Sequence, residues 1–102
     1  MIEKGIGLSI ESTMKEMNRI LSGKYEKKKI DKITCYELPD GQIITITGII
    51  TFNAIVVEYA ENLGEADKCW FEDGDLFYLS DYDSVVQLTE AVMSEIEGNI
   101  NN

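Results

Sequence analysis

Apolar residues near both ends of the chain recur at helical spacing, whereas the segment between them is rich in β-branched residues. Steps of three or four positions separate Ile10, Met14, Met17 and Leu21 near the start, and Val85, Leu88, Val92 and Ile96 near the end. Each set marks one apolar face of a helix. We expect Ser9 to cap the first helix and Gly23 to end it in a left-handed conformation. Ser80 with Asp83 should cap the second helix, which Gly98 closes.

The central segment predicts several strands. Lys24–Leu38 is expected to be one strand, Pro39-Asp40-Gly41 a reversal, and Gln42–Phe52 a second strand in which Gly48 marks a bulge or a close approach by another group. Residues 36–46, YELPDGQIITI, resemble one hairpin of actin. The resemblance covers eleven of 102 residues and implies the hairpin alone, because actin's phosphate-binding loops have no counterpart here.

Lysines crowd the beginning of the first expected strand, in the run KYEKKKIDK at 24–32. Lysines on an edge strand block unwanted pairing with other chains, and this is the preferred interpretation. The alternative is a phosphate-binding patch, which the missing arginines and the interrupting acids disfavour.

Two further units follow. Residues 53–64 are expected to form a strand, although Asn53 and Gly64 would suit the ends of a short helix. Residues 69–72 and 75–79 flank Asp73-Gly74, a pair typical of a tight hairpin turn. That hairpin would place Phe71 opposite Leu76, Trp70 opposite Phe77 and Cys69 opposite Tyr78, so that both of its faces are apolar or aromatic.

These elements predict an α+β fold. A mostly antiparallel sheet of about five strands would be flanked by an N-terminal and a C-terminal helix in two layers. We expect a single domain over residues 1–102, with flexible ends at 1–8 and 99–102. The chain shows neither a basic-then-apolar leader nor an 18-residue apolar run, so a cytoplasmic protein is expected.

Charge is distributed unevenly along the chain. The net charge is −10, yet residues 1–36 hold eight basic and five acidic side chains. From Glu37 onward Lys68 is the one basic residue against fourteen acids. Such a field repels phosphates, which argues against nucleic acid and anionic membranes and favours a protein partner with a basic surface. Solubility alone also explains many acidic proteins.

Several chemistries are disfavoured by composition. The chain has no histidine, and Cys35 and Cys69 have no metal-ligand spacing, so we expect no enzyme activity, cofactor or zinc site. Carboxylates at 72, 73, 75, 81 and 83 could hold Ca²⁺ or Mg²⁺, but their spacing does not fit an EF-hand. Turn formation and helix capping explain Asp73, Asp81 and Asp83 without a metal.

The aromatic hairpin is the preferred candidate site. Trp70 and Phe77 would anchor a partner protein, and Glu72, Asp73 and Asp75 would form an acidic rim that steers association. An inhibitor-like or immunity-like binding protein of bacterial or phage origin is therefore expected. The alternatives are a homodimer that pairs through its sheet and, less favoured, a metal-dependent module or enzyme.

Overall fold

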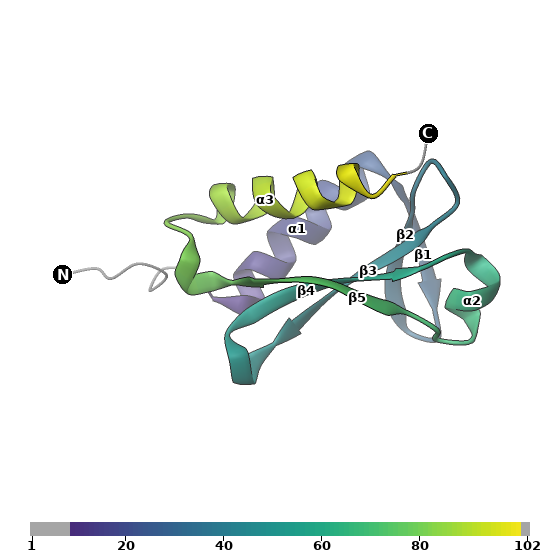
Figure 1. Ribbon diagram of the computed structural model, residues 1–102, viewed down its shortest axis with the longest axis horizontal. Helices are drawn as coiled ribbons and strands as arrows, with labels where there is room; N and C mark the ends of the chain where they lie inside the picture. The colour runs from purple at the N-terminus through teal and green to yellow at the C-terminus, as the bar shows by residue number, and fades with distance from the viewer. Residues whose placement is uncertain (1–8, 101–102) are drawn as a thin grey trace.

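The computed structural model describes residues 9–100 and has an α+β fold in which α1 and α3 lie on the same side of a twisted antiparallel sheet (Figure 1). In chain order the elements are α1 (Ile10–Lys24), β1 (Glu26–Ile30), β2 (Ile33–Glu37), β3 (Ile43–Ile49), a 3₁₀ turn (Ile50–Phe52), β4 (Ala54–Ala60), α2 (Leu63–Asp67), β5 (Glu72–Tyr78), a 3₁₀ turn (Leu79–Asp81) and α3 (Val85–Gly98). The sheet order is β1-β2-β3-β4-β5. The predicted fold class is confirmed.

The main core lies between the two long helices and one face of the sheet. Its fully buried members come from every layer: Met17, Leu21, Tyr36, Ile44, Ile55, Val57, Leu79, Leu88, Val92 and Ile96. These include most of the residues whose helical spacing predicted α1 and α3. Burial of this apolar area is the main force that holds the helices on the sheet.

Gly48 shows why α1 can approach the sheet closely. A Cβ atom at this position would overlap the side chain of Ile10 and contact Met14. The prediction that another group approaches Gly48 is therefore confirmed, and the group is the first turn of α1.

A smaller cluster covers part of the opposite face. Ala66 of α2 packs with Ile30, Cys35, Ile43 and Ala60, and Phe71 contacts the same group from the connection to β5. The other end of this face lacks such a cover in the described residues, and its exposed apolar side chains include Ile50, Phe52, Leu76 and Tyr78.

The strand predicted over Lys24–Leu38 is in fact a hairpin of two strands. Asp31 and Lys32 both have positive φ, 48° and 71°, and they reverse the chain between β1 and β2. Two non-glycine residues carry this turn, so no Asn-Gly or Asp-Gly pair signals it. β1 is an edge strand, so the predicted edge position of the lysines at 27–29 is confirmed.

The hairpin predicted around Asp73-Gly74 is wrong. These two residues lie inside β5, which runs unbroken from Glu72 to Tyr78 and pairs with β4. The reversal before β5 is made instead by α2 and by Cys69, which has a φ of 60°. Leu76 therefore pairs with Val56, Phe77 with Ile55 and Tyr78 with Ala54, not with residues 69–71.

Ser9 caps α1 and α3 ends at Gly98, as predicted, whereas the other two helix ends differ from prediction. Gly23 lies within α1, whose C-cap is Tyr25. α3 begins after Ser84, whose hydroxyl accepts from the Gln87 N–H at 3.2 Å while the Gln87 side chain accepts from the Asp83 N–H at 2.9 Å. Ser84 and Gln87 thus form a variant of the capping box, in which the Gln87 side chain bonds the N–H of Asp83 and not that of the N-cap residue, and this pair replaces the predicted Ser80–Asp83 cap.

Residues 53–64 are a strand over Ala54–Ala60, as preferred, and α2 follows with Asn62 as its N-cap. At the C-terminus, the Asn99 carbonyl accepts from the Gln42 side chain at 2.8 Å and Ile100 packs on the main core. The other residues predicted as flexible ends, 1–8 and 101–102, lie outside the described residues. Among the helices of residues 9–100, none has the length and apolar character needed to cross a membrane.

Candidate binding site

Two adjoining pockets form an acidic trough beside β5. Their volumes are about 610 and 430 Å³, and both are lined by Gln42, Tyr59 and Glu72. Six carboxylate side chains line the trough, and none of the described residues that line it is Lys or Arg. The six are Glu61, Glu65, Glu72, Asp73, Asp75 and Glu95.

An irregularity in the sheet shapes the part of the trough next to α3. The pairing of β4 with β5 shifts register between Val56 and Glu58, close to Gly74. A Cβ atom at Gly74 would lie 2.8 Å from the Tyr59 ring, 3.0 Å from the Glu95 carboxylate and 3.0 Å from the Val57 carbonyl oxygen. Glycine is therefore required where α3 brings Glu95 against the sheet.

Two hydrogen bonds fix the Glu95 carboxylate in the trough. Its oxygens accept hydrogen bonds from the Tyr59 hydroxyl and from the Asp75 backbone N–H, each at 2.8 Å. Burial raises the pKa of Glu95 above its usual value, although these two bonds oppose the rise. Burial also raises the pKa of Tyr59, with a further contribution from Glu95. No cation offsets the charge of Glu95 among the ion pairs of the described residues.

Replacing Glu95 by Gln should change how stability depends on pH. A carboxyl group whose pKa is raised by folding stabilises the protein most below its unfolded-state pKa, and this contribution is lost as the pH rises through the folded-state pKa. Glu95→Gln removes that loss. The free energy of unfolding of the variant should therefore rise relative to that of the wild type as the pH increases. The change is expected between about pH 4 and pH 7, from the ordinary titration range of Glu upward.

Urea denaturation at a series of pH values measures this difference. Glu90→Gln, an exposed position on the same helix, is the matched control and should follow the wild-type curve. Parallel curves for Glu95→Gln and the wild type would contradict the conclusion that folding raises the pKa of Glu95.

Trp70 stands at the other end of the trough. Its side chain is 59% exposed, and the Lys68 ammonium lies 4.6 Å from its ring centroid. A large aromatic side chain held at the surface beside carboxylates can stack on a cationic side chain or an apolar stem from a partner.

Four of the five predicted site residues line the trough, namely Trp70, Glu72, Asp73 and Asp75. The fifth, Phe77, lies elsewhere. It is 8% exposed and belongs to the main core. The predicted pairing of Trp70 with Phe77 depended on the hairpin, and β5 is instead one strand, so the two side chains are not neighbours across a turn.

The trough also contains residues that the sequence did not single out. Gln42, Tyr59, Glu95 and Asn99 come from three separate parts of the chain and meet only because the sheet and α3 bring them together. No local pattern marks them. Within residues 9–100, no group of three Asp, Glu, Cys or His side chains is arranged to hold a metal ion.

No family model matches this chain. Comparison with curated proteins found no significant match. Comparison with solved structures likewise found no significant match.

Proposed function

We propose that this chain is a small, non-enzymatic acidic binding protein whose trough receives cationic side chains from a basic surface of a partner protein. The observation that carries the proposal is a trough lined by six carboxylates and no described Lys or Arg, with an exposed tryptophan at one end. By analogy with small acidic inhibitors and immunity proteins of bacteria and phages, we place the chain in that class. We place its action in the cytoplasm, since Cys35 and Cys69 are both free thiols.

Two physical effects support this function. The net charge of −10 would draw a basic partner toward the chain, and clustered carboxylates would orient it at the trough. Trp70 would then supply the apolar anchor that most interfaces need, because exposed charge pairs alone contribute little affinity. Its exposure means that a partner can bury it without disturbing the core.

A cation that enters the trough would favour the ionised form of Glu95. The pKa of Glu95 is raised in the free protein, so binding would release a proton from it wherever it is still protonated. The partner should therefore bind more tightly as the pH rises through this range.

Replacing Trp70 by alanine should weaken partner binding by at least roughly tenfold, the usual loss for an anchor of this type. The immobilised wild-type chain first isolates a basic partner from an extract of the native host. Titration calorimetry then compares the purified partner with the wild type and with the variant. The charge reversal Glu72→Lys tests the rim in the same assay.

Tyr78→Ala is the matched control for these variants. Tyr78 is 41% exposed but does not line the trough, so its loss should leave the affinity unchanged. The proposal fails if Trp70→Ala binds as tightly as the wild type. It also fails if this variant unfolds, because Trp70 would then be a core residue.

The exposed apolar end of the sheet favours a second candidate function, a homodimer that pairs through the sheet. Ile50 is 84% exposed and Phe52 55% exposed, with Leu76 and Tyr78 nearby on the same side of β5. Exposed apolar side chains of this size often mark interfaces between copies. Measurement of the mass in solution over a range of concentrations tests it, and a monomer at every concentration would exclude it.

A further inference from the structure

The edge of β3 is only partly paired on the side of β2. The two strands pair at Tyr36–Ile44 and Glu37–Ile43, whereas β3 pairs with β4 along its whole length, from Ile43 to Ile49. Beyond Ile44 no further backbone pair joins the two strands, although the Thr45 hydroxyl still donates to the Thr34 carbonyl oxygen of β2 at 2.9 Å. Among the described residues no other strand pairs with this side of β3. The unpaired edge therefore lies between β2 and β3, inside the sheet, and not at the outer strands β1 and β5.

Backbone alternation identifies which groups face the opening. The Leu38 N–H donates to the Gln42 carbonyl at 2.8 Å, so residue 42 directs its backbone oxygen toward β2. In an antiparallel strand every second residue points its N–H and C=O to the same side. Ile46 and Gly48 therefore direct theirs toward the opening, and Thr45 and Thr47 direct theirs toward β4. Such groups are a template for an added strand.

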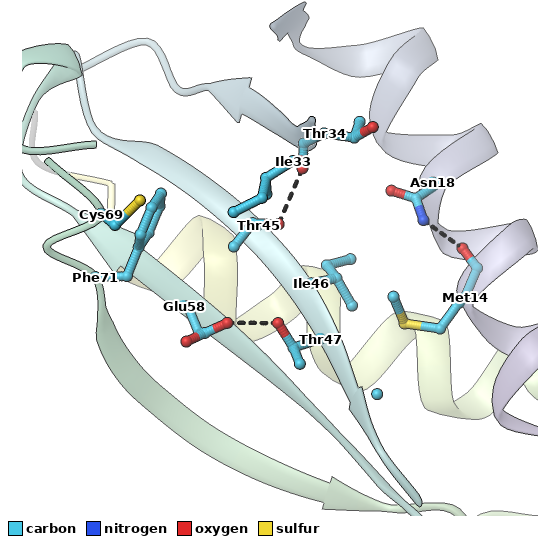
Figure 2. Close-up of a pocket in the computed structure, with 11 residues that line it drawn as sticks. Met14, Asn18, Ile33, Thr34, Thr45, Ile46, Thr47, Glu58, Cys69 and Phe71 are labelled. Atoms are coloured by element: carbon cyan, nitrogen blue, oxygen red, sulfur yellow. Dashed lines mark hydrogen bonds between the residues drawn. The ribbon is translucent and has the colours of Figure 1, made fainter. Parts of the chain in front are cut away.

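A pocket of about 590 Å³ lies along this edge (Figure 2). Met14 and Asn18 of α1 form one wall, with Ile46 beside them, while Phe71 and Cys69 lie on the other side of β3. An extended chain laid along β3 would direct alternate side chains toward these two walls. The pocket thus offers backbone partners and side-chain space together, as strand addition requires.

Glu58 sets the charge of the pocket. Of the described residues that line it, Glu58 alone is charged, and the Thr47 hydroxyl donates a hydrogen bond to its carboxylate (Figure 2). Neither Lys nor Arg pairs with Glu58 in the ion pairs of residues 9–100. A half-buried carboxylate without a cation favours a ligand that brings one.

We propose that the open edge of β3 binds an extended peptide segment of a partner protein, which pairs with the backbone of Ile46 and Gly48. The segment carries Lys or Arg opposite Glu58 and apolar residues toward Met14 and Phe71. This site is distinct from the acidic trough, although Cys69 and Phe71 line both. It does not depend on the function proposed above.

Hydrogen exchange in the free protein tests whether the edge is open. The amides of Ile46 and Gly48 should exchange at least roughly tenfold faster than those of Thr45 and Thr47, which face β4. Equal protection at the four amides would show that the edge is covered and would overturn the proposal.

Two synthetic octapeptides then test the ligand chemistry. Both alternate Val and Thr, and one has Lys and the other Glu at the centre. The Lys peptide should protect the amides of Ile46 and Gly48 and bind at least roughly tenfold more tightly than the Glu peptide. Protection confined to other amides, equal affinities or no binding by the Lys peptide would each overturn the proposal.

Glu58→Gln should largely remove the preference for the Lys peptide, since the amide keeps a hydrogen-bond acceptor for Thr47 but loses the charge. Glu61→Gln, which changes a carboxylate outside the β3 pocket, should keep the preference. If Glu58→Gln also keeps it, the charge complementarity is wrong. The amide spectrum of each variant confirms that it is folded.

Discussion

Replacing Phe77 by alanine should lower the free energy of unfolding by about 3–5 kcal/mol, the usual cost of deleting a buried aromatic ring. Phe77 is 8% exposed, pairs with Ile55 across β4 and β5, and lies in the main core with residues of α3. Its removal would leave a cavity between the sheet and the helices. Equilibrium denaturation in urea measures the loss.

Trp70→Ala is the matched control for this experiment. Trp70 is seven residues away and carries a larger aromatic ring, but it is 59% exposed and its replacement should change stability by less than about 1 kcal/mol. The two variants therefore separate a core aromatic residue from a surface one. A stable Phe77→Ala variant together with an unfolded Trp70→Ala variant would contradict the register of β5.

Replacing Gly74 by alanine should destabilise the protein by about 1–3 kcal/mol, the range for an added methyl group in a packed site. The new Cβ would lie 3.0 Å from the Val57 carbonyl oxygen, and a backbone atom in the sheet cannot move aside as a side chain can. It would also press on Tyr59 and Glu95 and so disturb the hydrogen bond between them. Thermal or urea denaturation gives the change in stability.

Gly23→Ala is the control of opposite sign. Gly23 lies inside α1, and a Cβ there would meet no atom within 4 Å. Alanine should therefore raise the free energy of unfolding by about 0.5–1 kcal/mol through its higher helix propensity. If Gly74→Ala also stabilises the protein, then α3 does not approach β5 as closely as described.

The sequence predicts the terminal helices well because each helix buries one face. The apolar residues of that face recur every three or four positions, and this spacing can be read directly from the sequence. The strands are harder, and the expected number of five is correct only because two errors cancel. Asp31 and Lys32 make a turn without the glycine that usually announces one. Asp73-Gly74 looks like a turn, but this glycine is needed for a close approach by Tyr59 and Glu95. Neither the turn at Asp31 and Lys32 nor the close approach at Gly74 can be predicted from the neighbouring residues in the sequence.

The residues of the candidate site also differ in whether the sequence predicts them. Trp70, Glu72, Asp73 and Asp75 line the trough and are close in sequence, so a local pattern of aromatic and acidic residues points to them together. Glu95 completes the trough from another element, and its place depends on how α3 packs across the sheet. Contacts between distant segments of this kind leave no periodic signal in one sequence.

The two cysteines differ in a way that matters for spectroscopy. Cys35 is fully buried, and burial raises the pKa of its thiol, so it should be inert toward labelling reagents. Cys69 is exposed and lines both the trough and the β3 pocket. One maleimide dye should therefore attach at a single position in the unaltered chain, where its fluorescence would report the arrival of a ligand at either site.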